Sequence, residues 1–334
     1  MAYWRKMKGG TMTEYKAQEP KIPFQIQAYT DEGRNRFAHL INMIADHSPT
    51  GRAVLEDAAK SGYKLQMQAM SGTQGFVCDE LKTVFLSTCY DDDVLVETLA
   101  HECRHVQQGM KGMPDNFHEF VIRDAVKVNR AIEADAEVIG ASVCYEIMKN
   151  GGNDAPLKAL EKKVPKIVNG MMSASKGDEK IATPAMMRGA FDGWFKNKPI
   201  MDIYEKSVIT NDCLGNSMRD YRDSKRTDFF KREMNSSEIV NMVCHDSAGK
   251  CYWSTNPDVM EEPARLQVAE STVVFAKSVN EGRAEDGLNV DTSYEGLYVY
   301  GKPLPAPAKT AEQPKKADKS AAFNAIMARR KLSR

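Results

Sequence analysis

The sequence predicts an α+β fold that is mostly helical, with a small antiparallel sheet or hairpin packed on one helix and a helical C-terminal extension. Three observations predict this class. Apolar residues recur every three or four positions over residues 31–60 and 117–149, which is the spacing of amphipathic helices. Residues 63–70 alternate between apolar and polar side chains, as a half-buried strand does. Residues 76–78 and 83–88 then indicate a further strand or hairpin.

The helices have recognisable ends. Residues 48–51, Ser-Pro-Thr-Gly, interrupt the first helical stretch and predict two helices in its place. Aspartates at 91–93 precede the next helix, which should run from Val94 to about Gln108, because negative charge is favourable beside the unpaired N–H groups of a helix start. The helix after it, over residues 117–149, is expected to break near Val128.

We expect four parts along the chain. They are a polar N-terminal segment, a core, a mainly helical extension and a flexible, proline-rich basic tail, at residues 1–30, 31–150, 151–300 and 301–334. In the extension, residues 266–279 are expected to form one helix. In the tail, residues 308–334 hold eight Lys or Arg against two Asp or Glu, which predicts a solvated segment.

The composition is that of an ordinary globular protein. Lys and Arg together number 46, as do Asp and Glu, so the formal net charge is zero. Such a balance provides no global field for nucleic acid or an anionic membrane, so we expect no nucleic-acid partner apart from weak contact by the basic tail. No stretch approaches the roughly 18 consecutive apolar residues of a membrane span, so no membrane association is expected.

The cysteines bear on the compartment. There are seven, an odd number, and none forms a CxxC pair. In a chain of 334 residues this pattern is typical of reduced thiols rather than of a disulfide framework. The N-terminus also lacks the apolar stretch of a secretory signal. We therefore expect a cytoplasmic protein.

A possible metal site lies in the helix that follows the aspartates. His101-Glu102-Cys103-Arg104-His105 places two imidazoles four residues apart, hence on one helical face, where both can reach one ion. Glu102 follows the first histidine directly, so its carboxylate can reach a water on the metal without binding the metal. Histidine and carboxylate ligands with one position left for water are typical of catalytic zinc. Gln108 lies on the same face as the two histidines.

The next helix offers the missing third ligand. Glu133 and Glu137 are four residues apart, so they share a face, and small residues around them allow another helix to approach closely. One of them can bind zinc, and the other can hold a ligating histidine by a hydrogen bond. Asp135 should face elsewhere, toward solvent or Arg130.

This arrangement resembles the gluzincin branch of zinc metallopeptidases, the thermolysin-like class. It is also similar to minimal gluzincin-like metallopeptidases among uncharacterised bacterial proteins, which have an HExRHxxQ helix and then an EADAE-type helix. The resemblance covers residues 31–150 at most and implies a zincin-like core. It implies that His101, His105 and Glu133 bind Zn²⁺, Glu102 is the catalytic base, and Glu137 supports His101. Thermolysin-like enzymes have Asp in place of Glu137.

We therefore expect a zinc metallopeptidase that hydrolyses a peptide or protein substrate, with an edge strand around Val84 lining the cleft. The alternative is a catalytically inactive metal-binding protein that acts as a binding or regulatory module. A third reading, a helical interaction protein with a coincidental motif, predicts that His101, His105 and Glu133 lie far apart. The donors considered for a transition-state oxyanion are His118, Tyr145, Tyr204 and His245, each of which we expect to be structural.

Overall fold

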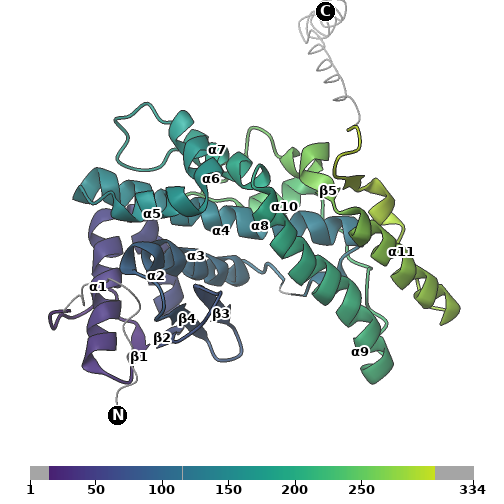
Figure 1. Ribbon diagram of the computed structural model, residues 1–334, viewed down its shortest axis with the longest axis horizontal. Helices are drawn as coiled ribbons and strands as arrows, with labels where there is room; N and C mark the ends of the chain where they lie inside the picture. The colour runs from purple at the N-terminus through teal and green to yellow at the C-terminus, as the bar shows by residue number, and fades with distance from the viewer. Residues whose placement is uncertain (1–14, 115, 305–334) are drawn as a thin grey trace, which may run out of the picture. The chain divides into compact units, whose positions relative to one another are not determined.

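The structure is a computed structural model that describes residues 15–114 and 116–304 (Figure 1). It is mainly α-helical, with one four-stranded and one two-stranded sheet among the described residues. The expected α+β class is confirmed. The described residues up to Tyr300 form one compact unit. Residues 305–334, most of the expected basic tail, lie outside the described residues.

The larger sheet is mixed. Its strands are β1 (Gln25–Gln27), β2 (Lys64–Gln68), β3 (Gly75–Cys78) and β4 (Thr83–Ser87), in the order β1-β2-β4-β3. β2 is parallel to both β1 and β4, whereas β3 and β4 form an antiparallel hairpin. The expectation of an antiparallel sheet was therefore right for the hairpin and wrong for the other two pairs.

β4 lies inside the sheet, although we expected an edge strand around Val84. It pairs with β2 on one side and with β3 on the other, and all five of its residues are buried. A mostly apolar strand that is covered on both faces suits an inner position. Phe76 of β3 is exposed, and β3 is the outer strand at the hairpin end of the sheet.

Part of the segment expected to be polar and N-terminal joins the core. β1 pairs with β2, and the side chains of Ile22 and Phe24 just before it are buried. Three residues of β1 with alternating polarity, QIQ, are too short a pattern to separate from a loop in the sequence. The strand depends on its neighbour for both its hydrogen bonds and its position.

The interruption at residues 48–51 separates two helices, as expected. They are α1 (Asp31–His47) and α2 (Pro49–Lys60). Ser48 ends the first helix by donating its backbone N–H to Ile44, and its hydroxyl starts the second by accepting from the N–H of Gly51 at 2.8 Å. One residue therefore serves as the cap of both helices.

Two helices carry the residues of the expected metal site. They are α3 (Asp92–Met110) and α4 (Ile122–Gly151). α3 begins after Asp91 with two aspartates in its first turn, as predicted. α4 is continuous, so the break expected near Val128 was wrong. Because neighbours cover this helix on several sides, its buried residues, Val128 among them, do not keep to a single stripe.

The other elements are mostly short helices, together with two short strands. In order, they are η1 (Phe117–Glu119), α5 (Ala155–Lys163), α6 (Pro165–Ser173), α7 (Pro184–Phe195), α8 (Lys198–Tyr204), the π-helix η2 (Glu205–Gly215), α9 (Asn216–Ser224), α10 (Ser236–Val243), η3 (Val259–Glu261), η4 (Pro263–Leu266), β5 (Gln267–Val268), α11 (Glu270–Glu285), η5 (Ser293–Gly296) and β6 (Tyr298–Val299). The helix expected at 266–279 is thus α11, which begins later because β5 pairs with β6 just before it.

Figure 1 shows α4 in the middle of these elements, with α1 and α2 toward one of its ends and α9 and α11 toward the other. α3 packs along α4 and against the hairpin strands, and α5, α6 and α7 also contact α4. The buried apolar side chains form one cluster that includes both the predicted core and the predicted extension. None of the helices in the described ranges is long and apolar enough to cross a membrane.

Candidate metal centre

Helices α3 and α4 bring His101, His105 and Glu133 together. The Nε2 atoms of the two histidines lie 3.0 Å apart. Oε2 of Glu133 lies 3.6 Å from Nε2 of His101 and 3.7 Å from Nε2 of His105. The histidines are one helical turn apart on α3, and Glu133 faces them from α4. The interpretation that the motif is coincidental predicted that these three residues lie far apart, and these distances contradict that prediction.

The three atoms have the spacing and chemistry of a metal site. Tetrahedral zinc ligands at 2.0–2.1 Å from the ion are about 3.3 Å from one another. Oε2 of Glu133 is buried and has no hydrogen-bond partner among the described residues. A buried, unpaired carboxylate oxygen is costly, and a cation between it and the two imidazole nitrogens would stabilise the group. The donor set therefore fits a metal ion.

In the metal-free chain, a proton on His101 can supply that positive charge. Burial alone would lower the pKa of His101, but the nearby carboxylates of Glu133, Glu102, Glu137 and Glu97 outweigh burial and raise the pKa to about 10. The site thus favours a cation strongly enough to hold a proton on an imidazole at neutral pH.

The carboxyl group of Glu102 interacts electrostatically with His101, His105 and Glu133. The side chain is buried, with 8% of the residue exposed. Burial raises the pKa of Glu102, and the neighbouring His101 and His105 oppose that shift. A carboxyl group whose pKa is raised toward neutrality is suited to accept and return a proton.

The other nitrogen of His101 faces acidic side chains. Nδ1 lies 3.7 Å from Oε1 of Glu97, which is one turn earlier on α3. Glu137, which we expected beside His101, belongs to the same group, since ligand atoms of Glu97, His101 and Glu137 lie within 4.8 Å of one another. Sequence reasoning missed Glu97. The spacing of four residues before His101 was the available signal, because that offset places both side chains on one helical face.

Lys163, at the end of α5, compensates the charge of these acids. Its Nζ lies 3.2 Å from Oε2 of Glu97 and 3.8 Å from Oε1 of Glu137. Burial lowers the pKa of Lys163, but the two carboxylates outweigh it and raise the pKa, so the amine stays charged. The lysine therefore supplies the positive charge beside Glu97 and Glu137. The group formed by His101, His105 and Glu133 is the candidate metal centre.

Gly140 on α4 makes room for the Glu97 carboxylate. A Cβ atom at this position would lie 2.9 Å from both Cγ and Oε1 of Glu97. We expect Gly140→Ala to lower the free energy of unfolding by about 1–3 kcal/mol, because the buried carboxylate must move away from Lys163. Urea denaturation measures this change.

The matched control is Gly109→Ala at the end of α3, where no atom lies within 4 Å of the new methyl group. Alanine there should leave stability unchanged or raise it by up to about 1 kcal/mol through helix propensity. Equal effects of the two substitutions would contradict the packing of Glu97 against Gly140.

One of the four residues considered as an oxyanion donor lies at the centre. Burial raises the pKa of Tyr204 well above its ordinary value, and the charges of Glu133 and Glu137 add to this shift. The other three residues have structural contacts: Tyr145 donates to the carbonyl of Glu179, the ring of His118 packs on Phe229, and the carbonyl of His245 accepts from Arg104.

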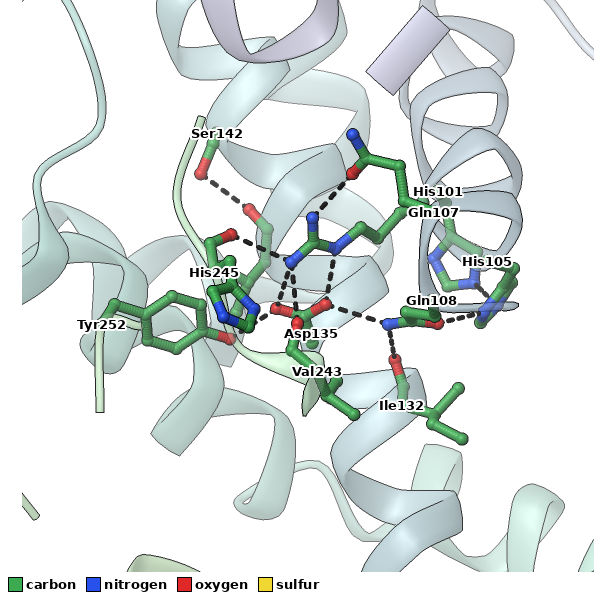
Figure 2. A network of polar contacts seen from close by, with 12 residues as sticks. His101, His105, Gln107, Gln108, Ile132, Asp135, Ser142, Val243, His245 and Tyr252 are labelled. Carbon is green, nitrogen blue, oxygen red and sulfur yellow. Dashed lines mark hydrogen bonds and ion pairs between the residues drawn. The ribbon is translucent and has the colours of Figure 1, made fainter. Parts of the chain in front are cut away.

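A buried ion pair also joins α3 and α4, and its Asp135 is labelled in Figure 2. Nε of Arg104 donates to Oδ2 of Asp135 at 2.7 Å. Asp135 is fully buried, so the expectation that it faces solvent or Arg130 was wrong. Arg130 instead pairs with Glu205 at 3.1 Å. The sequence alone does not indicate that Arg104 is the partner of Asp135, because Arg104 belongs to another helix.

Solvent reaches the centre from one side. The side chains of His105 and Glu133 are 21% and 13% exposed, whereas those of His101 and Glu97 are 8% and 3% exposed. His105 and Glu133 are therefore more accessible to solvent than His101 and Glu97.

The chain is similar to a known protein family. A family model described as "Putative metallopeptidase family (DUF6782)" matches residues 21–253. This range includes both helices of the metal centre, the mixed sheet and the segment that contacts Arg104. No curated protein and no solved structure matches the chain.

Proposed function

This chain belongs to that metallopeptidase family, and from this premise we propose that it is a zinc-dependent peptidase with Glu102 as its general base. The observation that carries the proposal is the convergence of two imidazole nitrogens and one unpaired carboxylate oxygen within 3.0–3.7 Å. Glu102 supports it, because it adds a second carboxyl group whose pKa is raised by burial at the same place.

Zinc fits this donor set better than magnesium or calcium does. Two histidines and one glutamate make a three-ligand set that leaves one position for substrate or water. Magnesium and calcium prefer sites made of oxygen atoms alone. When bound, zinc would polarise a substrate carbonyl and lower the pKa of a water molecule.

The proposed task of Glu102 is proton transfer. Its carboxylate takes a proton from the attacking water and then returns that proton to the leaving amine. In this proposal His101, His105 and Glu133 are the ligands, and Glu102, directly after His101 in the sequence, is not a ligand. The raised pKa of Glu102 brings its affinity for a proton closer to that needed at neutral pH.

We propose that Tyr204 donates a hydrogen bond to the oxyanion that forms on the substrate. Its pKa is raised, so the hydroxyl keeps its hydrogen at neutral pH. A donor aimed at the position where negative charge develops stabilises the transition state. Tyr204 is the last residue of α8, in the second half of the chain. In this proposal the second half of the chain contributes to the reaction as well as to the fold.

A peptide substrate would bind along β3 rather than along the strand named from the sequence. β3 is the outer strand of the hairpin, and its neighbour in the sheet is β4. It also contacts α3, which carries the histidines. An extended peptide can add to such an edge through main-chain hydrogen bonds, which gives affinity with little sequence preference.

The apparent zinc affinity should rise with pH. His101 must lose a proton before its Nε2 can bind a metal, and the pKa of that group in the metal-free chain is about 10. Below this value the proton competes with zinc, so affinity should increase by up to about tenfold per pH unit and level off near pH 10. Competition with a chelator of known affinity at several pH values measures this slope. A flat profile between pH 6 and 9 would contradict the raised pKa of His101.

The test of the proposed function is hydrolysis of a mixed peptide library by the full chain, with mass spectrometry of the products. Cleavage should require zinc, disappear with a chelator and return when zinc is restored. Glu133→Ala should abolish both zinc retention and cleavage. A protein that binds zinc but cleaves no peptide at any zinc concentration would support a non-catalytic metal-binding role instead.

A further inference from the structure

The side chain of Gln108 lies between a proposed metal ligand and the buried ion pair. Figure 2 shows it with His105 on one side and Asp135 on the other. Its Oε1 is 2.8 Å from Nδ1 of His105. Its Nε2 donates to Oδ2 of Asp135 at 2.9 Å and to the carbonyl of Ile132 at 3.0 Å. Gln108 is almost fully buried, so water does not compete for these bonds.

The partners of Gln108 determine which way its amide points. A carboxylate and a backbone carbonyl only accept hydrogen bonds, so the group that faces Asp135 and Ile132 must be the NH₂ group. The reversed amide would place its oxygen against both acceptors. Oε1 therefore faces His105 and can only accept there.

The amide orientation in turn determines the tautomer of His105. Because Oε1 accepts, Nδ1 of His105 must carry the hydrogen. A neutral imidazole has one hydrogen, so Nε2 is left with its lone pair, and this is the atom that lies 3.0 Å from Nε2 of His101. The nitrogen that faces the other two proposed ligands is thus the one that can bind a metal.

Asp135 is itself held in place from two directions. Arg104 donates to it through Nε at 2.7 Å and Nη2 at 3.3 Å, and the hydroxyl of Tyr252 donates at 2.8 Å. Nη2 of Arg104 also donates to the carbonyls of Val243 and His245, at 2.8 and 2.9 Å. The contacts of His105 thus continue through Gln108 and Asp135 to the segment Val243–Tyr252, far away in the sequence.

We propose that Gln108 is a positioning residue of the metal centre, anchored by Asp135, and that it holds His105 in the tautomer whose Nε2 is free for the metal. This inference rests on the proposed metal site. The ring of His105 then has the tautomer and orientation that a metal ion needs before the ion binds, which strengthens binding.

The neighbouring Gln107 provides a matched control. It is also buried, and like Gln108 it hydrogen-bonds to two other side chains. It accepts from Nη1 of Arg104 at 2.7 Å and donates to Asp57 at 2.6 Å. These bonds involve no proposed ligand. Methionine has nearly the shape of glutamine without its amide, so Gln107→Met and Gln108→Met remove comparable bonds from adjacent positions of one helix.

Zinc affinity, measured by competition with a chromophoric chelator, is the first readout. Gln108→Met should weaken zinc binding by about 10- to 100-fold, and Gln107→Met should stay within about twofold of the unsubstituted chain. Equal losses in the two variants would overturn the proposal, because they would show a general effect of losing a buried amide.

The second readout needs no metal. Long-range ¹H–¹⁵N NMR spectra of the metal-free full chain should show neutral His105 with its hydrogen on Nδ1, both in the unsubstituted chain and in Gln107→Met. Gln108→Met should shift the ring toward the Nε2–H tautomer. A hydrogen on Nε2 of His105 in the unsubstituted chain would overturn the proposal even if Gln108→Met does not fold. A chain that binds no zinc but has the Nδ1–H tautomer would count against the proposed function and not against the role of Gln108.

Discussion

Glu102→Gln is expected to lower the rate of peptide hydrolysis by about 10²- to 10⁴-fold while zinc binding is retained. Glutamine has nearly the same shape as glutamate, so the buried side chain still fits, but its amide cannot accept a proton from water at neutral pH. Since Glu102 is not one of the three converging ligands, the zinc content should remain that of the unsubstituted chain. Hydrolysis and bound zinc should be measured on the same preparations.

The control for this prediction is Glu161→Gln, the same substitution at an exposed position of α5. It should leave both hydrolysis and zinc content unchanged. If Glu102→Gln keeps the full rate, Glu102 is not the general base. If it also loses its zinc, the carboxylate is a ligand, and the roles of Glu102 and Glu133 have to be reassigned.

The largest effect on stability is expected from Arg104→Met. The side chains of Arg104 and Asp135 are 4% and 0% exposed. Removing the guanidinium leaves a buried carboxylate without its counter-charge and two backbone carbonyls without a donor. Breaking one partner of such a pair lowers the free energy of unfolding by about 3–5 kcal/mol. Urea denaturation should be done on metal-free protein, so that changes in zinc affinity do not enter the result.

Arg226→Met is the matched control, since Arg226 forms a similar ion pair with Asp228 on the surface. An exposed pair is screened by water and contributes little, so this variant should unfold at the same urea concentration as the unsubstituted chain. Similar effects of the two substitutions would contradict the burial of the Arg104–Asp135 pair and its contacts with the segment after α10.

The helices near the site could be predicted from the sequence because their signals are local. The aspartates at the start of α3, the interruption at Ser48 and the apolar spacing of α1 all act within a few residues of the structure that they determine. The order of the strands depends on distant pairs instead. Residues 83–87 alone do not indicate that β4 lies between β2 and β3, because that position results from pairing with Lys64–Gln68.

The same distinction applies to the metal centre. His101 and His105 could be placed together because four residues make about one helical turn. The need for a third ligand indicated Glu133 or Glu137, and the resemblance to gluzincins favoured Glu133. Several of the residues around these ligands could not be placed from the sequence. Lys163 and Tyr204 reach the site from α5 and α8, and Asp135 finds Arg104 on a different helix. Such contacts depend on how helices pack, which a single sequence does not display.

The measurement that tests the zinc site most directly is anomalous X-ray diffraction at the zinc absorption edge from crystals of the zinc-loaded chain. We expect one strong peak about 2.0–2.2 Å from Nε2 of His101, Nε2 of His105 and a carboxylate oxygen of Glu133. A peak bounded instead by Glu97 and Glu137, or no peak near the two histidines, would contradict the proposed centre.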